Sequence, residues 1–345
     1  MNVDYIIVGS GLAGILFCEV LKQHNKTFIV FENESQHSST VAGGLYNPVI
    51  LKRFTQVWKA KEQLELGLPM YHKLEQSLNI KLDYKIPIHR LFASVEEQNN
   101  WFEACDKPSL TNFLSTEILH KTNTAIKSNF GYGKVLGTGR IDTTTLIKKY
   151  RKDLDKNKQL LKESFKYSEL ASNSTHVTYN DYKAKYIIFA EGFGVTKNPF
   201  FNHLPLKPTK GELLTIYAPD LKIDFVLKSS VFLIPLGKDL YIVGATYEWD
   251  DMSPNVTVNA KDELLNKLDK FLSCDYRVID QVAGIRPTVK DRRPLVGQHH
   301  EYKNMYILNG LGTRGVMIAP YVAKQLYSYI EGLSPLDKEI DISRF

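Results

Sequence analysis

The sequence predicts an α/β protein (α+β over the whole chain) with two domains, one built on a parallel sheet and one on an antiparallel sheet. Its 345 residues suit about two domains. A strand, a glycine-rich turn, a helix and a second strand occupy residues 5–31, a pattern typical of parallel sheets. Strand-rich segments joined by turns occupy much of residues 206–283, which indicates antiparallel pairing.

The composition is that of an ordinary globular protein. Hydrophobic residues make up 43% of the chain and charged residues 24%, which excludes fibrous and disordered classes. Cys18, Cys105 and Cys274 are odd in number and far apart, which argues against a disulfide framework, a zinc site and an iron–sulfur cluster. The net charge of +6 is too small for a dedicated nucleic-acid binder, although it leaves room for a local basic patch.

Residues 5–21 are nearly free of charge but do not form a signal peptide. No basic segment precedes them, and Gly9, Gly11 and Gly14 interrupt the apolar run. No other stretch reaches the length of about 18 apolar residues expected of a membrane-spanning helix. We therefore expect a cytoplasmic protein without a membrane partner.

The first element in the chain is a βαβ unit. Residues 5–8 form an apolar strand, residues 9–14 read Gly-Ser-Gly-Leu-Ala-Gly, and a helix with buried positions follows. A second apolar strand at 27–31 ends directly before Glu32. This order and spacing is the fingerprint of a Rossmann-like dinucleotide-binding domain, although a glycine turn without a ligand is the alternative.

Each residue type in this unit suits a dinucleotide. Gly9 permits the tight turn, Gly11 lets a pyrophosphate approach the backbone, and Gly14 allows helix and strand to pack closely. With Leu12 and Ala13, these glycines place the helix N-terminus against the phosphates. Glu32 can accept hydrogen bonds from ribose hydroxyls, and its charge disfavours NADP.

The next segment is a run of small residues soon after the acid. It contains Thr40, Val41, Ala42, Gly43 and Gly44. Such residues let the backbone lie against a large flat cofactor, although a flexible loop explains them equally well. NAD and FAD share the ADP half, so the fingerprint does not distinguish them.

A second glycine-rich turn near the C-terminus favours FAD. A strand at 305–309 leads into this turn, and an apolar helical stripe follows it. The turn contains Gly310, Gly312, Thr313, Arg314, Gly315 and Val316, with a spacing that does not fit a second dinucleotide fingerprint. A helix N-terminus there would face the pyrimidine end of a flavin, whose reduced form is negatively charged.

Four motifs together resemble a known family. They are the N-terminal fingerprint, residues 41–48, residues 284–294 with Gly-Ile-Arg-Pro-Thr and Asp-Arg-Arg-Pro, and residues 310–320. The set resembles the D-amino-acid oxidase/glycine oxidase superfamily of FAD enzymes. Residues 310–315 are especially similar to the flavin domain of the bifunctional enzyme that matures 5-methylaminomethyl-2-thiouridine in tRNA.

The resemblance implies a discontinuous domain organisation. The FAD-binding domain comprises residues 1–60, 135–205 and 284–345, and the antiparallel-sheet substrate domain comprises residues 61–134 and 206–283. A strand at 186–190 returns the chain to the cofactor and ends at Gly192, another cofactor-binding candidate. Glu191 stands where the family commonly has a small residue, so its role stays open.

Two further segments complete the expected elements. Residues 58–78 have helical spacing, which Gly67 and Pro69 are expected to break into two helices. The lysine-rich segment 148–166 is expected to be a solvated helix face and linker, not a patch that binds RNA.

The resemblance also implies the chemistry and the residues that carry it. In the family, a hydride leaves the carbon beside a neutral amine and arrives at flavin N5. Arg286 matches the carboxylate-binding arginine of the Gly-x-Arg-Pro motif, with an ion pair to Asp291 as the alternative. Tyr247 ends a strand of the substrate sheet, where its hydroxyl points into the pocket or its ring packs across the sheet. Arg53 is a weaker candidate.

We therefore expect an FAD-dependent oxidoreductase that removes a hydride from the C–N bond of a small amino acid or amine. The FAD is expected to be noncovalent, since no cysteine lies near the C-terminal motif, and no metal is expected. The adjacent His299 and His300 are expected at the surface. Two alternatives stay open: an FAD enzyme acting on a modified tRNA uridine, and a non-catalytic flavin-binding module. Substrate identity, electron acceptor and oligomeric state are not predicted.

Overall fold

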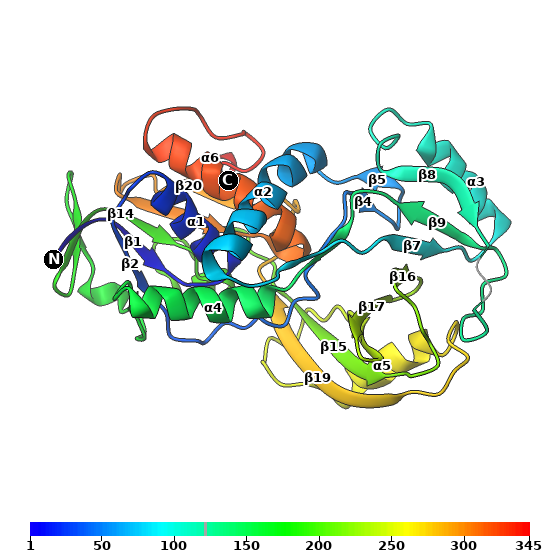
Figure 1. The fold of residues 1–345 in the computed structure, drawn as a ribbon. Helices are drawn as coiled ribbons and strands as arrows, with labels where there is room; N and C mark the ends of the chain where they lie inside the picture. Colours follow the sequence, from blue (N-terminus) through cyan, green and yellow to red (C-terminus); the bar gives the residue numbers. More distant parts are fainter. Residues whose placement is uncertain (121–122) are drawn as a thin grey trace.

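The computed structural model describes residues 1–120 and 123–345. It consists of two large sheets, each with its own helices, and Figure 1 shows them at opposite ends of the molecule. Both chain termini lie in the half that holds the parallel sheet. The α/β fold class predicted from the sequence is confirmed.

The first sheet is mostly parallel and has the order β11-β2-β1-β14-β13-β12, with β21 beside β14 and β20 beside β21. Its central strands β1 (Asn2–Val8), β2 (Phe28–Phe31), β14 (Tyr182–Phe189) and β21 (Met305–Asn309) run parallel. The edge strands are β11 (Leu160–Leu161), β12 (Ala171–Ser172) and β20 (Leu295–Gln298), and β13 (Val177–Tyr179) lies between β14 and β12. The buried central strands explain the unbroken apolar runs of their sequences.

Four helices pack around this sheet and form its main core. They are α1 (Leu12–Gln23), α2 (Ala60–Leu78), α4 (Thr143–Lys156) and α6 (Gly315–Ile330). Helix α6 packs against both α1 and α2, and their buried residues share one hydrophobic cluster. The 3₁₀ turns η2 (Gly192–Lys197) and η3 (Gly312–Arg314) follow strands β14 and β21. The cofactor-side glycine turns therefore lie at the carboxyl ends of parallel strands, as in other open α/β sheets.

The second sheet has the order β19-β15-β18-β17-β16-β7-β9-β8 and is antiparallel except between β16 and β7. Its first half consists of β15 (Thr209–Tyr217), β16 (Val226–Lys228), β17 (Phe232–Gly237), β18 (Leu240–Gly244) and β19 (Arg277–Arg286). Its other strands are β7 (Ile88–Leu91), β8 (Leu114–Leu119) and β9 (Tyr132–Val135). Helices α3 (Val95–Cys105) and α5 (Val258–Leu268) pack on it.

Short strands fill the region between the two sheets. They are β3 (Leu45–Tyr46), β6 (Asp83–Tyr84) and β10 (Gly139–Ile141) in one small sheet, and β4 (Val49–Ile50) and β5 (Thr55–Gln56) in another. The remaining 3₁₀ turns are η1 (Tyr167–Glu169) and η4 (Ile342–Arg344). The division of the chain into two domains at the stated boundaries stays a prediction.

The expected break within residues 58–78 is wrong, because α2 is continuous through both Gly67 and Pro69. A Cβ at Gly67 would lie 3.3 Å from Pro320 Cγ of α6, so this glycine serves the close approach of two helices. Residues before and after the expected break, such as Ala60 and Tyr71, are buried, and the Tyr71 hydroxyl donates a hydrogen bond to the carbonyl oxygen of Val316 in α6, which holds the helix there despite the proline. Tertiary packing here outweighs the local preference.

The expectation of surface exposure is wrong for His299 and holds for His300. His299 is buried beside Phe200 and Phe201, and its Nδ1 accepts hydrogen bonds from the backbone N–H groups of Glu301 and Tyr302. It thus stabilises the turn between β20 and β21, while the next residue faces solvent.

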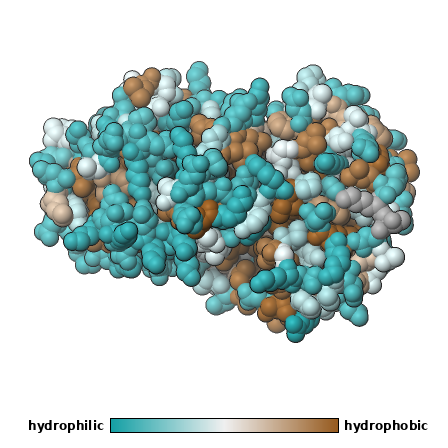
Figure 2. Space-filling model, viewed as in Figure 1, coloured by the Kyte–Doolittle hydropathy of each residue, from teal (hydrophilic) through white to brown (hydrophobic). Residues whose placement is uncertain are grey.

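Figure 2 shows a mostly hydrophilic surface, with hydrophobic residues in small groups on this face. Among the described parts of the chain, no helix combines the length and apolar character needed to cross a bilayer.

Candidate active site

A cavity of about 1360 Å³ lies where the two sheets meet. It exceeds the common range of about 300–1,000 Å³ for small-molecule sites, so it has room for a dinucleotide and a second ligand. Most predicted site residues line it: Gly9, Gly11, Leu12, Ala13, Glu32, Val41, Ala42, Gly43, Gly44, Gly192, Tyr247, Arg286, Gly312, Thr313, Arg314, Gly315 and Val316. Thus the structure brings both glycine turns and the Gly-Ile-Arg-Pro motif to one space.

Gly9 and Gly14 build the corner where β1, α1 and β14 meet. Gly9 has a φ of +101°, and a Cβ there would lie 2.5 Å from the carbonyl oxygen of Ala190. A Cβ at Gly14 would lie 1.9 Å from the carbonyl oxygen of Gly9. Gly14 does not line the cavity, so its contribution is the close packing of helix on strand.

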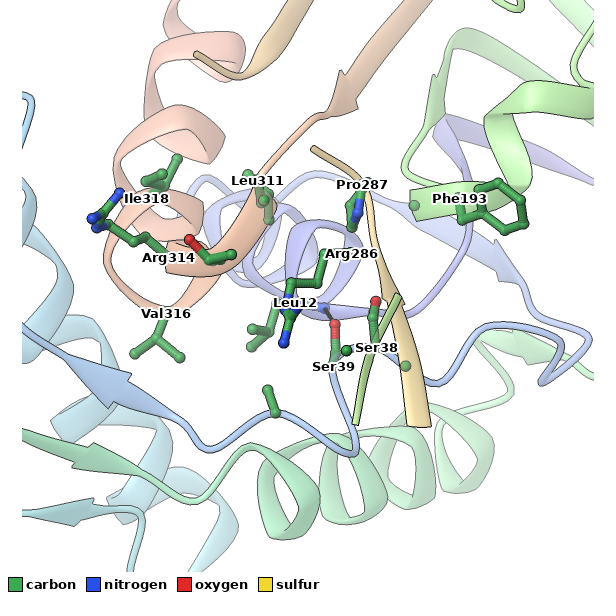
Figure 3. Close-up of a pocket in the computed structure, with 18 of the residues that line it drawn as sticks. Leu12, Ser38, Ser39, Phe193, Arg286, Pro287, Leu311, Arg314, Val316 and Ile318 are labelled. Atoms are coloured by element: carbon green, nitrogen blue, oxygen red, sulfur yellow. Dashed lines mark hydrogen bonds between the residues drawn. The ribbon is translucent and has the colours of Figure 1, made fainter. Parts of the chain in front are cut away.

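Helices α1 and α6 both begin at the cavity without a side-chain cap. Gly11 and Arg314 are their N-caps, and neither provides a capping hydrogen bond. Helix α2 also lacks such a bond, whereas Ser94, Asp142 and Thr257 cap α3, α4 and α5. Uncapped N–H groups and the helix dipole form an anion site, which fits the phosphates of FAD at α1. One of these N–H groups, that of Leu12, donates a hydrogen bond to Ser39 Oγ at 3.2 Å (Figure 3).

Glu32 is buried at the end of β2 and has several donors around it. Its Oε2 accepts hydrogen bonds from the backbone N–H and the hydroxyl of Ser10 and from Arg151, and its Oε1 accepts from Glu34 N–H. A carboxylate has about four acceptor positions, so Oε1 keeps capacity for a ribose hydroxyl. Sequence reasoning missed Arg151, which comes from the lysine-rich segment but faces inward from α4.

Residues 38–44 pass between the two sheets. Val41 packs against Gly284 of β19, where an added Cβ would lie 2.5 Å from Val41 Cγ2. Gly44 has a φ of +71°, and its missing Cβ leaves room for the carbonyl oxygen of Ile141. Thr40 lies outside the cavity, and its carbonyl accepts a hydrogen bond from the hydroxyl of Thr144.

Glu191 and Gly192 line the cavity at the end of β14. Burial raises the pKa of the Glu191 carboxyl to about 7, although hydrogen bonds from Tyr167 and Asn198 act in the opposite direction. Gly192 has a φ of +57°, with no atom within 4 Å of an added Cβ. A carboxyl group thus stands next to the glycine turn on the cofactor side.

The C-terminal turn faces the cavity from Gly312 to Val316. Gly310 lies outside it and has a φ of +72°, and a Cβ there would lie 2.7 Å from Val289 Cγ2. Gly310 is therefore a packing position, while the uncapped start of α6 faces the cavity directly behind it.

Arg286 lies at the end of β19, where its guanidinium crosses over Gly211 of β15. A Cβ at Gly211 would lie 1.9 Å from Arg286 Nη2, so only glycine leaves this space free. Arg286 Nη1 donates to the carbonyl oxygen of Thr246 at 3.2 Å, and the guanidinium lies 4.8 Å from the ring centre of Tyr247. Burial lowers the pKa of Arg286.

The alternative partner for Arg286 is engaged elsewhere. Asp291 pairs with Arg344 at 3.0 Å. Within residues 1–120 and 123–345, Arg286 forms no ion pair with a carboxylate, and it lines the cavity. A partly buried guanidinium of this kind suits a carboxylate ligand.

Tyr247 is 49% exposed and stacks on Trp249, which is 58% exposed and also lines the cavity. Sequence reasoning missed Trp249, Gly211, Lys228 and Ser39. For Gly211, the sequence offered one signal, which is a glycine within a strand-like segment, directly after Lys210. Arg53 lines the cavity as well.

The described residues contain no group of three or more histidine, cysteine or acidic side chains arranged to hold a metal ion. Cys18 and Cys105 are buried, Cys274 is partly buried, and none of them lines the cavity.

Comparison with known proteins agrees with this arrangement. The sequence pattern of the family described as FAD dependent oxidoreductase matches residues 4–328. Glycine oxidase of Bacillus subtilis (strain 168) is 23% identical over 341 residues, which cover 92% of this chain and 90% of that protein. The tRNA 5-methylaminomethyl-2-thiouridine biosynthesis bifunctional protein of Nitrosospira multiformis is 29% identical over 152 residues, but these cover 40% of this chain and 24% of that protein.

The fold is also similar to that of solved structures. The crystal structure of glycine oxidase from Geobacillus kaustophilus superposes with a TM-score of 0.79 at 16% identity and covers 100% of this chain and 98% of that chain. The resemblance inferred from the four motifs is therefore confirmed. The chain belongs to the FAD dependent oxidoreductase family and is an FAD-dependent enzyme.

Proposed function

We propose that this enzyme removes a hydride from the C–N bond of a small amino acid or amine that carries a carboxylate. The observation that supports this most strongly is the position of Arg286. Its guanidinium lies over Gly211, faces the cavity and has no carboxylate partner among the residues that the structure describes. Bound FAD would supply the acceptor for the hydride and its two electrons.

The described residues have distinct parts in this proposal. Arg286 binds the substrate carboxylate through two parallel hydrogen bonds, which fixes the direction of the neighbouring C–N bond. Apolar side chains of the substrate sheet, Leu213, Phe232, Ile234 and Ile242, line the same space and exclude water. Tyr247 flanks the guanidinium and restricts its orientation.

The cofactor residues follow from the same geometry. The uncapped N-terminus of α1 would hold the pyrophosphate, Glu32 a ribose, and the start of α6 the pyrimidine edge of the flavin. Residues 41–44 would lie along the cofactor between these ends. We propose that the flavin is held noncovalently, since no cysteine lines the cavity within the described part of the chain.

Anaerobic titration of the purified yellow holoenzyme tests the reaction. Amino acids and amines added without oxygen should bleach the flavin absorbance when they are substrates. A holoenzyme that no carboxylate-bearing amine bleaches would be a flavin-binding module, and the proposed reaction would be wrong.

Replacing Arg286 with alanine tests its assignment. The Arg286→Ala variant should raise KM for a carboxylate substrate by about a hundredfold, because it removes a bidentate charge-assisted pair. FAD content should stay at the wild-type level. An unchanged KM would remove Arg286 from the substrate site.

A further inference from the structure

Charged side chains of both signs line the cavity, and four arginines come from one part of it. Glu32 and Glu191 lie at the ends of β2 and β14, on the side proposed for the ADP half of the cofactor. Arg286, Arg314, Arg292 and Arg293 line the side where β19 and the start of α6 meet. The substrate end is therefore strongly basic.

Two of these arginines, Arg286 and Arg314, interact with Tyr247. The ring centre of Tyr247 lies 4.8 Å from the Arg286 guanidinium, and the same residue interacts electrostatically with Arg314. Burial lowers the pKa of Arg314, and repulsion by Arg292 and Arg293 acts in the same direction. Figure 3 shows Arg286 and Arg314 reaching the cavity from separate elements.

The four arginines lack protein counter-ions. Across the two described stretches of chain, none of the four arginines forms an ion pair with a carboxylate, and the nearby Asp291 pairs with Arg344. Arg293 lies 5.4 Å from the ring centre of Trp58, which positions it without neutralising it. Arg292 is exposed, but Arg286, Arg293 and Arg314 are partly buried, and like charges gathered in such a site are costly unless an anion joins them.

Arg314 lies at the start of α6, where the pyrimidine edge of the flavin is proposed to lie, so one substrate carboxylate on Arg286 leaves Arg292 and Arg293 without an anion. We infer that the substrate carries a second anionic group, a carboxylate or a phosphate, which Arg293 binds while Arg286 holds the first. This inference rests on the proposed function and names the substrate class for the same site.

A small dianion fits the cavity better than an RNA backbone. The rim beside the exposed Trp249 carries Glu248 and Asp250, both exposed. The Glu248 carboxylate accepts hydrogen bonds from the backbone N–H groups of Trp249 and Asp250, which keeps its charge at this rim. A phosphate backbone along this rim would be repelled.

Matched substrate pairs test the inference with wild-type holoenzyme. Glycine is compared with iminodiacetate, alanine with aspartate, and serine with O-phosphoserine, using both enantiomers where they exist. The dianionic member of at least one pair should have a kcat/KM at least about tenfold higher. The carboxylate and phosphate pairs distinguish the two kinds of second anion.

Substitution of Arg293 tests whether this residue binds the second anionic group. The Arg293→Gln variant should lower the ratio of dianion to monoanion kcat/KM by about tenfold, and Arg293→Lys should restore part of it. Arg277→Gln is the matched control, because Arg277 is an exposed arginine at the far end of β19 outside the cavity. It should leave the ratio unchanged.

The outcomes separate this inference from the proposed function. Bleaching by glycine or alanine with a ratio near one in every pair would overturn the inference and leave the amine oxidation standing. Loss of FAD from Arg293→Gln at an unchanged ratio would assign Arg293 to the cofactor phosphates instead. Salt-sensitive tRNA binding without any preference for dianions would likewise overturn it.

Discussion

Gly211 decides where the Arg286 guanidinium lies, although it has no side chain of its own. The Arg286 guanidinium occupies the space that a Cβ at this position would fill. Because the guanidinium is the far end of a flexible side chain, it can move aside at little cost to folding. The effect of a larger residue should therefore fall on substrate binding and not on stability.

We expect Gly211→Ala to raise KM for the carboxylate substrate by about tenfold, because the displaced guanidinium loses its bidentate geometry. Steady-state kinetics measures this, with FAD content and Tm near those of the wild type. In the Arg286→Ala background the same substitution should add nothing, since the residue through which it acts is gone. Additive effects would contradict the assignment.

The Glu191 carboxyl group should make the free energy of unfolding depend on pH. Its pKa is raised to about 7 in the folded state from an ordinary value of 4.5, so folding favours the protonated form. The folded state binds more protons than the unfolded state in this interval, and the free energy of unfolding should fall as pH rises through it.

Replacing Glu191 with glutamine should flatten that decline, because glutamine keeps hydrogen-bonding atoms but does not ionise. Calorimetric Tm values of the apoprotein between about pH 4.5 and pH 7 check this. Glu163→Gln, at an exposed carboxylate that also lines the cavity, is the control and should keep the wild-type profile. Parallel wild-type and Glu191→Gln profiles would refute the role.

At the scale of elements, the glycines of the N-terminal turn divide into two kinds. Gly14 is required by packing, since an added Cβ would lie 1.9 Å from the Gly9 carbonyl oxygen. Gly11 has ordinary backbone angles, and its added Cβ would meet only Ser39 Oγ, at 3.3 Å. One residue holds the helix to the strand, and the other keeps the backbone open to the cofactor.

Gly14→Ala should destabilise the apoprotein by about 1–3 kcal/mol, because the clash is with backbone that cannot rotate away. It should also lose FAD, since the helix N-terminus shifts. Gly11→Ala should reduce FAD affinity while the apoprotein keeps its Tm. Thermal unfolding of both apoproteins and the ratio of flavin to protein distinguish the two outcomes, and an equal loss of Tm in both would contradict this division.

The sequence predicted those features that a short local motif marks. The βαβ unit, the C-terminal turn and Arg286 follow from short motifs in which spacing alone is informative. Gly211 and Arg151 act through strand pairing and helix packing with residues far away in the chain, so nothing beside them in the sequence marks their role. The continuity of α2 through Pro69 likewise depends on its contact with α6.

At the scale of the whole molecule, the cofactor would join parts of both sheets. Residues from β2, β14, β15, β19 and the start of α6 line one cavity, so a ligand that fills it stabilises their arrangement. Ligand that binds only the folded state raises stability with its concentration. The free energy of unfolding of the whole molecule should therefore increase when FAD binds.

Titration of apoprotein with FAD should raise Tm progressively, and heat or acid should release all of the flavin into the supernatant. The expected release follows from the positions of the three cysteines, none of which lines the cavity. Absorbance of the precipitate and the supernatant measures it. Yellow colour that stays with the denatured chain would show a covalent link.

The central sheet joins strands that are made at very different times during synthesis. β1 can pair with β2 soon after both are made. Its other edge stays unpaired until β14 is made, and β14 in turn pairs with β21, which is made later still. Ribosomes add about 5–20 residues per second, so roughly 15–60 s separate the first strand from the last. Throughout that interval we expect the nascent chain to expose an apolar strand edge, which is the kind of surface that chaperones shield.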